Sequence, residues 1–157
     1  MCNSILKTEL KNIQDLKKYI GKQIGLSDWI EIKQENINAF AKLTHDEQWI
    51  HIDVEKSKKY SPYKKTVAHG FYVLSLATKF MYETFYISSV KMGVNYGLDR
   101  VRFMSPTFSG GFLRASISLM EVSIDESSAK YKMSITFEQK GHDKPVCVAE
   151  FLAMAYE

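Results

Sequence analysis

Hydrophobic and polar residues alternate along much of the C-terminal half of the chain, as they do in half-buried strands. The alternation predicts strands over residues 100–103, 113–124, 131–138 and 146–155. Within the second of these strands the apolar positions change phase, which predicts a β-bulge at Leu119–Met120. The last strand is apolar on both faces, as expected for a strand in the middle of a sheet.

The N-terminal half is predicted to be mainly helical. Residues 1–25 have the pattern of a polar helix or arm, and residues 29–33 alternate like a short strand. Apolar residues at helical spacing predict a helix over residues 35–45, and a more polar helix follows over residues 54–60. Residues 70–85 are apolar nearly all round, so they predict a helix that other elements cover on most sides.

Helices followed by several antiparallel strands indicate an α+β fold. The 157 residues fit one compact domain, residues 1–157, with residues 1–25 as its N-terminal helix or arm. In so small a domain, an apolar helix needs a covering layer, and the strands can supply it. We therefore expect a hot-dog fold, in which an antiparallel β-sheet wraps around a central buried helix.

Composition narrows the classes of function. The net charge is +3 and no long basic run occurs, so nucleic acid is not an expected partner. No apolar run approaches the roughly 20 residues of a membrane span, and the N-terminus lacks the apolar region of a signal peptide. Cys2 and Cys147 belong to no disulfide or metal-binding motif, and Cys147 has the pattern of a buried thiol. These features predict a cytoplasmic protein.

The segment around Asp46 and His51 carries the candidate chemistry. Five residues on an unbroken helix separate two side chains by roughly 140°, so the pair can converge only if the helix ends and residues 48–50 form a loop. Hydration of an α,β-unsaturated thioester needs a base, an acid and a donor to the enolate oxygen. A neutral histidine suits the first task and a carboxyl group the second. The N–H of Gly70, at the start of a helix, suits the third.

The motifs around these residues resemble the MaoC-like dehydratase family, which includes the (R)-specific enoyl-CoA hydratases. The hydratase signature F-A-x-x-[ST]-x-D-x-N-P-x-H-x-D, followed by A-H-G, is matched by Phe40-Ala41, Thr44, Asp46, His51, Asp53 and Ala68-His69-Gly70. A branch similar to nodulation protein N has Q-W-I-H and N-Y-G-x-x-x-V-R-F, which are matched at 48–51 and 95–103. The resemblance extends from about Trp29 to the C-terminus.

This resemblance implies a homodimeric hydratase/dehydratase that acts on trans-2-enoyl or (3R)-3-hydroxyacyl thioesters of CoA or of an acyl-carrier protein. It assigns the acid–base roles to Asp46 and His51 and the oxyanion donor to Gly70. Ser75 and Thr78 match positions where hydratases often have a small hydroxyl residue. The reaction implies no cofactor and no metal. For Asn95, lining the pocket and stabilising a turn are equally consistent with the sequence.

The chain departs from the signature at three positions. Gln48 and Trp49 replace the usual Asn-Pro, and His45 replaces a common glycine. Trp49 lies two residues before His51, so we expect its indole to contact the substrate and limit the length of the acyl group. The alternative is that Trp49 belongs to the core, in which case its loss would affect stability and not chain-length preference.

Other interpretations remain at this stage. His69 is expected to be structural and His45 to face solvent, although both could join Asp46 and His51 as metal ligands. Such a metal site lacks support from any HExxH or Cys/His spacing. The basic side chains that could bind CoA phosphates, or simply be solvated, are Lys64, Lys65, Arg100 and Arg102.

Two other functions compete with hydration. The hot-dog fold also hosts thioesterases, which usually have a carboxylate on or near the central helix. Glu83, the sole acid between Gly70 and Phe85, lies late in that helix. A non-catalytic subunit that binds acyl thioesters is the third possibility, and the presence of both Asp46 and His51 argues against it.

Overall fold

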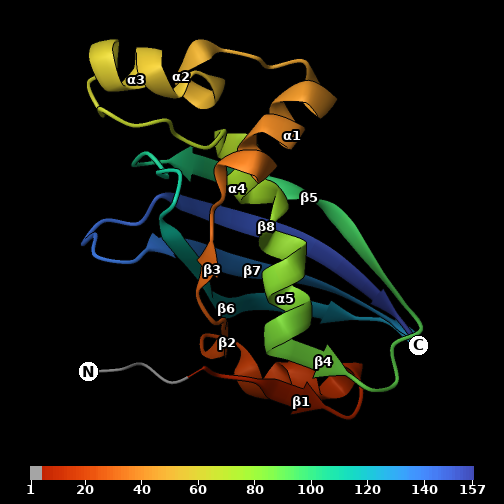
Figure 1. The fold of residues 1–157 in the computed structure, drawn as a ribbon. Coiled ribbons are helices and arrows are strands. Elements are labelled where there is room, and N and C mark those ends of the chain that lie inside the picture. The colour runs from red at the N-terminus through yellow and green to blue at the C-terminus, as the bar shows by residue number, and fades with distance from the viewer. Residues whose placement is uncertain (1–4) are drawn as a thin grey trace.

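A computed structural model describes residues 5–157 of the chain, and Cys2 lies outside the described residues. Its main feature is a six-stranded antiparallel sheet (Figure 1). The order is β2 (Gln23–Leu26), β6 (Phe112–Ile124), β7 (Ser128–Gln139), β8 (Cys147–Tyr156) and β5 (Met92–Phe103), with β3 (Ile30–Glu31) pairing with β6 next to β2. All four strands predicted in the C-terminal half are present.

The predicted bulge in β6 is confirmed. The register between β6 and β7 shifts between Leu119 and Glu121, so that Met120 has no partner opposite it. Alternate residues of β6 before the bulge, including Ile117 and Leu119, are buried, and those of β7 follow the same alternation. The extra residue changes which side chains face the core, as the phase change in the sequence predicted.

Two short helices, α4 (Gly70–Ser75) and α5 (Ala77–Thr84), lie across one face of the sheet, and the sheet curls around them (Figure 1). A single helix over residues 70–85 was the prediction, but the chain divides at Leu76 and already forms strand β4 (Phe85–Ile87) at Phe85. The helices and the sheet are held together by buried side chains. Phe80 of α5 and Phe137 of β7 meet edge to face, with ring centroids 6.2 Å apart.

The prediction that this helical segment is covered on most sides is wrong for one of its faces. Phe71 is 71% exposed and Tyr82 is 77% exposed, whereas Phe80 and Thr84 are fully buried. The sheet therefore covers the segment on one side and leaves aromatic side chains uncovered on the other. Among residues 5–157, β5 pairs only with β8, so it is an edge strand of the sheet.

The N-terminal segment also differs from the prediction. In place of a polar helix or arm it contains strand β1 (Thr8–Leu10), a 3₁₀ helix (Ile13–Tyr19) and strand β2. β1 pairs in parallel with β4 as a separate two-stranded sheet. Ile13 and Leu16 of the 3₁₀ helix are buried in the core, so this segment is an integral part of the domain.

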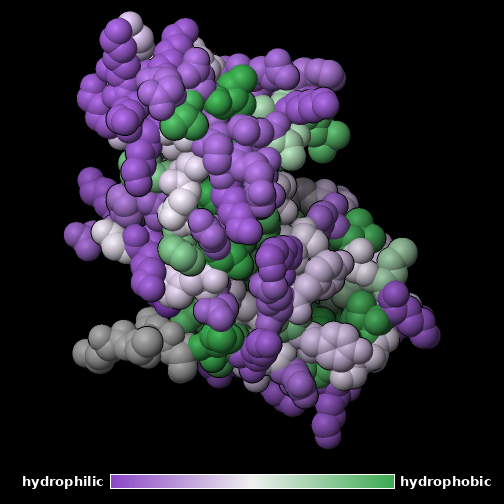
Figure 2. All heavy atoms as spheres, in the orientation of Figure 1, coloured by the Kyte–Doolittle hydropathy of each residue, from purple (hydrophilic) through white to green (hydrophobic). Residues whose placement is uncertain are grey.

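Three helices form a layer over one end of the sheet (Figure 1). They are α1 (Gln34–Thr44), α2 (Trp49–Ile52) and α3 (Val54–Tyr60), and the surface that they present in Figure 2 is mostly hydrophilic. The helices predicted at 35–45 and 54–60 are confirmed, but α2 replaces the loop expected at residues 48–50. None of the helices over residues 5–157 is long and apolar enough to cross a membrane.

Candidate active site

A tight turn after α1 brings Asp46 and His51 together. His45 ends α1 in the left-handed conformation, with φ of 59°. Glycine adopts this conformation without strain because it has no Cβ, which accounts for the glycine that is common at this position in the signature. The chain then reverses through Asp46 and begins α2 at Trp49, which returns His51 toward the Asp46 side chain. The convergence that the sequence required is therefore achieved by a turn followed by a new helix.

His51 is held in one orientation by the backbone around it. Its side chain is buried, with 7% of the residue exposed, and its Nδ1 lies 2.7 Å from the carbonyl oxygen of Val67. A carbonyl can only accept, so Nδ1 carries the proton and Nε2 is the unprotonated nitrogen of the neutral ring. Gln34 donates to the carbonyl of His51 at 2.7 Å and accepts from Thr66 at 2.5 Å, which joins α1, α2 and the segment before α4.

His69 supports both of the other residues. Its Nε2–H donates to the backbone carbonyl of Asp46 at 2.9 Å, and its ring stacks on that of His51 with centroids 3.7 Å apart. The ring of Phe40 also packs against that of His69, with centroids 5.1 Å apart. His69 is 3% exposed and its Nδ1 has no partner among the described residues. His69 thus has a structural role, as expected: its hydrogen bond anchors the turn that carries Asp46.

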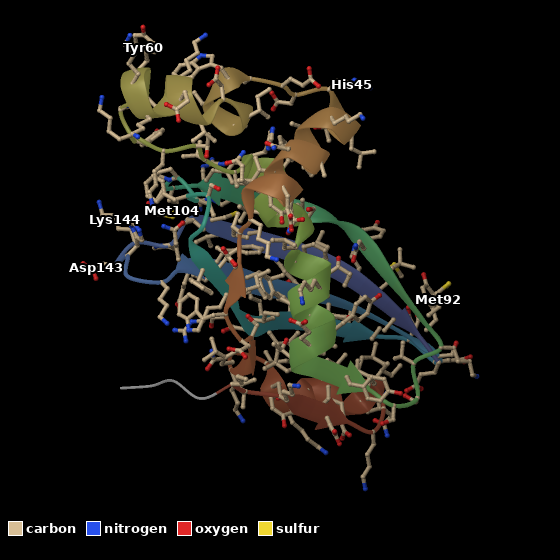
Figure 3. All side chains as sticks on the ribbon, viewed as in Figure 1. His45, Tyr60, Met92, Met104, Asp143 and Lys144 are labelled. Atoms are coloured by element: carbon tan, nitrogen blue, oxygen red, sulfur yellow. The ribbon has the colours of Figure 1, made fainter. Side chains whose placement is uncertain are left out.

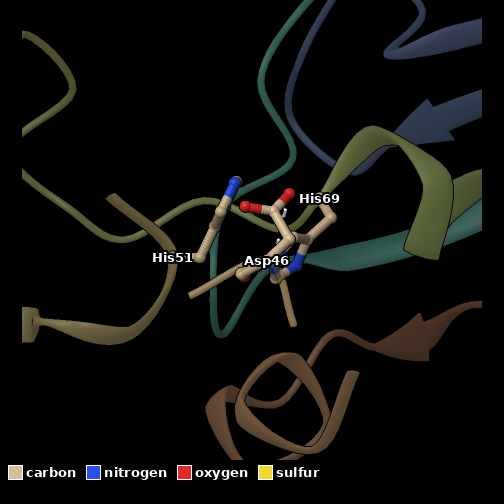
Figure 4. Close-up of side chains that lie close together, drawn as sticks. All are labelled: Asp46, His51 and His69. Atoms are coloured by element: carbon tan, nitrogen blue, oxygen red, sulfur yellow. Dashed lines mark hydrogen bonds and ion pairs between the residues drawn. The ribbon is translucent and has the colours of Figure 1, made fainter. Parts of the chain in front are cut away.

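The three side chains form one cluster, drawn in Figure 4. One donor atom from each of Asp46, His51 and His69 lies within 4.8 Å of the other two. The Asp46 side chain is 57% exposed, so it faces solvent while both imidazoles are buried. These residues are also the ones that could hold a metal. Carbonyl oxygens already occupy His51 Nδ1 and His69 Nε2, which leaves one nitrogen on each stacked ring. His45, the fourth metal-ligand candidate, is exposed and outside the cluster.

A pocket of about 280 Å³ is lined by residues that flank His51 and His69 in sequence, although none of the three side chains of the cluster is part of its walls. Its walls come from α2, the segment before α4, α4 itself and the loop after β5, and the residues include Ile50, Tyr63, Val67, Gly70, Phe103 and Pro106. The sequence argument named Gly70 but missed the other walls. Phe103 is the last residue of the N-Y-G-x-x-x-V-R-F motif, and Val67 directly precedes A-H-G. The positions of these two motifs could therefore have indicated both wall residues.

Gly70 lies at the start of α4 in this pocket, and its N–H has no hydrogen-bond partner among residues 5–157. A Cβ at this position would come within 2.9 Å of the Phe103 ring. The close approach to Phe103 is therefore a physical reason for glycine that was not considered from the sequence. The free N–H at a helix start is suited to an oxyanion.

Ser75, Thr78 and Asn95 occupy a different place. They line a second pocket between the helices and β5, which Gly70 does not reach. Asn95 donates to the hydroxyl of Thr78 at 3.0 Å, and Ser75 donates to the carbonyl of Tyr72 at 2.7 Å. Ser75 ends α4 and lies roughly 140° around that helix from Gly70, whereas Thr78 lies in α5, beyond the break at Leu76.

Trp49, the first residue of α2, packs toward α3. The ammonium group of Lys56 is 5.2 Å from the centre of its indole, and the side chain is half-buried. The neighbouring residue Ile50 lines the pocket that contains Gly70, and Trp49 does not. The indole thus contacts α3 in the structure described here.

The ionisation of His51 is expected to make stability depend on pH. Burial lowers the pKa of His51 below its ordinary value of 6.5; the nearby His69 acts in the same direction, whereas Val67 and Asp46 oppose it. Because the pKa of His51 is lower in the native state than in the unfolded chain, the unfolded chain binds a proton at this ring more readily below about pH 6.5, so stability falls as the pH decreases. We expect His51→Gln to lose less Tm than the wild type between pH 7.5 and 5.5. Equal losses in thermal melts of the two proteins would contradict this expectation.

Comparison with known proteins agrees with the geometry. Residues 15–140 match the MaoC like domain. The chain is 39% identical to 3-hydroxyacyl-thioester dehydratase Z of Mycobacterium tuberculosis over 141 residues, which cover 89% of this chain and 93% of the relative. It is 36% identical to nodulation protein N of Rhizobium leguminosarum bv. viciae over 145 residues, or 91% of this chain and 90% of the relative.

The fold has a close structural counterpart as well. A monoamine oxidase regulatory protein from Archaeoglobus superimposes with a TM-score of 0.77 at 26% identity, and the match covers 98% of this chain and 99% of the other. The sheet curled around the helical segment is thus the predicted hot-dog fold. With a match over most of its length and relatives well above 30% identity, the chain belongs to the MaoC-like domain family.

Proposed function

We propose that this protein is a hydratase/dehydratase that interconverts trans-2-enoyl thioesters and (3R)-3-hydroxyacyl thioesters. The observation that carries the proposal is the fixed tautomer of His51. Its Nδ1–H is bound to the Val67 carbonyl, so Nε2 is the basic nitrogen of a ring that has one nitrogen within 4.8 Å of an Asp46 carboxyl oxygen. A relative that covers most of the chain is named as a 3-hydroxyacyl-thioester dehydratase.

The proposed chemistry in the direction of hydration uses both side chains. His51 Nε2 removes a proton from water as the water oxygen bonds to C3 of the enoyl group. The electron pair of the C2–C3 double bond moves toward the thioester carbonyl, and the N–H of Gly70 stabilises the negative charge on that oxygen. The carboxyl group of Asp46 then delivers a proton to C2. In dehydration the same residues act in reverse, with Asp46 as base and His51 as acid.

The environment of each residue fits its proposed role. His51 is buried and neutral, as a base near pH 7 must be, whereas the exposed carboxyl group of Asp46 can exchange protons with solvent between turnovers. The His69 hydrogen bond fixes the backbone of Asp46, so the carboxyl group varies in position only by side-chain rotation. Glu83, the carboxylate considered for a thioesterase, is bound to Lys79 on the surface of α5. We therefore favour hydration over thioester hydrolysis.

The experiment that tests this function is incubation of the purified protein with trans-2-enoyl-CoA substrates. Hydration removes the absorbance of the conjugated thioester without releasing CoA thiol, and chiral chromatography identifies the product as the (3R) isomer. Release of thiol with the double bond intact would replace the proposal with a thioesterase. Binding without any change of the substrate would replace it with a non-catalytic subunit. We expect this activity in the cytoplasm, with no cofactor needed.

The acyl-length preference gives a further prediction. Trp49 was expected to contact the acyl chain, but Ile50 is the residue of α2 that lines the pocket. We expect Ile50→Ala to raise kcat/KM for longer enoyl chains relative to short ones by about tenfold, since one methylene in an apolar pocket contributes roughly 1–3 kcal/mol. Trp49→Ala is the matched comparison. A larger change of the ratio in Trp49→Ala than in Ile50→Ala would restore the original assignment of Trp49 as the limiting residue.

We also infer that two copies of the chain form a homodimer. The unpaired edge of β5 exposes Met92, Val94, Tyr96 and Leu98, and the adjacent helices expose Phe71 and Tyr82. Hydrophobic residues are visible along this side of the molecule in Figure 2. A long unpaired edge with apolar neighbours favours association. Light scattering at micromolar concentration should give a molecular mass twice the 18.1 kDa of one chain. In the double variant Tyr82→Asp/Tyr96→Asp, the mass should fall to that of a single chain. A monomeric wild type would contradict the inference.

A further inference from the structure

A third pocket, of about 450 Å³, lies beside the candidate active site on the outer face of the sheet. Its walls are Arg100, Arg102, Phe103, Met104, Val148 and Glu150. Phe103 and Met104 also line the pocket that contains Gly70, so the two pockets meet at the end of β5. Met104 lies at this end of the strand in Figure 3, opposite Met92 at the strand's beginning.

The two arginines are oriented toward one face of the sheet. Arg100 pairs with Glu150 and Arg102 with Val148 in the register of β5 and β8, and residues two apart in a strand point to the same side. Phe103, the next residue, points to the opposite side, where its ring approaches Gly70. A ligand that extends from Gly70 past Met104 therefore leaves the inner pocket and enters the outer one.

Both guanidinium groups are free to bind an anion. Arg100 and Arg102 are exposed, and neither forms an ion pair with a carboxylate within residues 5–157. The neighbouring acids Glu150 and Asp99 are bound to Lys132, at 3.1 and 2.8 Å. Arg102 uses one Nη to donate to the Val101 carbonyl, which orients the group and leaves its other N–H donors available.

We propose that Arg100 and Arg102 bind the phosphate at the end of the pantetheine arm of the thioester substrate. The inference rests on the proposed function, because that function supplies the thioester. In this proposal, the arm of a thioester held at Gly70 passes Met104 into the outer pocket, and the arm ends in phosphate in both CoA and acyl-carrier proteins. Guanidinium groups bind phosphate oxygens through charge-assisted, often bidentate, hydrogen bonds. The outer pocket therefore recognises the carrier, while the inner pocket holds the reacting group.

The test compares thioesters that share one short enoyl group and differ in the arm. Arg100→Gln, Arg102→Gln and the double variant are assayed with the CoA, phosphopantetheine and pantetheine thioesters; the last of these has no phosphate. We expect the double variant to raise KM about ten- to a hundredfold for the two phosphorylated substrates, with kcat unchanged. The KM for the pantetheine thioester should stay at the wild-type value. A loss confined to the CoA thioester would overturn the assignment to the shared phosphate, because only the nucleotide end of CoA would then be bound.

Controls separate this proposal from the proposed function. Lys17→Gln removes the same charge from an exposed position in the 3₁₀ helix and should leave every KM unchanged. Titration calorimetry of CoA itself with wild-type and double-variant protein measures phosphate binding without any turnover. If the wild type hydrates no thioester, the proposed function fails, whereas calorimetry still tests the arginines. Equal losses on all three thioesters, or no loss on any, would overturn the phosphate site.

Discussion

Replacement of His51 by alanine is expected to lower kcat/KM for hydration by about 10²–10⁴-fold, and Asp46→Asn should have an effect of the same order. The reason is that each group moves a proton in the same transition state. The double variant should therefore be only slightly worse than either single variant, because a transition state that has lost one partner gains little from the other. The measurement is the initial rate with a short enoyl-CoA.

The controls for this experiment lie in the same turn. Glu47→Gln removes a carboxylate one residue from Asp46, and His45→Asn keeps a residue that tolerates the left-handed conformation of φ 59°. Both variants should keep kcat/KM within a few-fold of the wild type. If either His51→Ala or Asp46→Asn also kept its activity while remaining folded, the acid–base assignment would be wrong.

The largest expected effect on stability comes from Phe80→Ala in α5. Phe80 is fully buried and its ring meets Phe137 of β7, so its removal leaves a cavity between the helix and the sheet. Such truncations typically cost about 3–5 kcal/mol. Urea unfolding at one fixed protein concentration measures the change, since association would otherwise alter the apparent stability.

Phe112→Ala is the matched comparison for Phe80→Ala. It makes the same substitution in β6 at a ring that is 44% exposed and contacts Lys140 across its face. We expect Phe112→Ala to lower the free energy of unfolding by well under half as much as Phe80→Ala, because a partly exposed ring buries less apolar surface. Similar losses in the two variants would show that α5 is not the anchor of the core.

The strands and two of the helices could be predicted because their sequences are locally consistent. The helix at 54–60 matches the prediction at both ends, since Asp53 caps it by accepting from Lys56 and Ser61-Pro62 cannot extend it. The bulge at Met120 is visible as a phase change. In both cases the local sequence and the tertiary structure favour the same conformation.

The failures occur where tertiary contacts decide the conformation. Residues 49–52 form a helix of one turn, too short for periodicity to reveal, and the Gln34 hydrogen bond to the His51 carbonyl holds it in place. The division between α4 and α5 falls at Leu76, where no glycine or proline marks it. β1 depends on parallel pairing with β4, a partner more than seventy residues away.

The candidate site was predicted in part. The signature correctly indicated that Asp46 and His51 converge, although their catalytic roles stay predictions. It did not reveal that His69 binds the Asp46 backbone, because a hydrogen bond to a carbonyl leaves no pattern in one sequence. The substrate-contact assignments of Ser75, Thr78 and Asn95 also stay predictions, and in the single chain these residues line a pocket separate from that of Gly70.

The break at Leu76 divides the central segment into parts with different tolerance of change. α5 carries the buried anchors Ala77, Phe80 and Met81, whereas α4 contributes Gly70 and Val73 to the pocket. Gly70 has no room for a Cβ beside the Phe103 ring, so Val73 is the α4 wall residue at which a change of side-chain size can reshape the pocket while the α5 anchors stay in place. Because Val73 is itself 2% exposed, a lineage that changes its acyl specificity there must accept some loss of core packing.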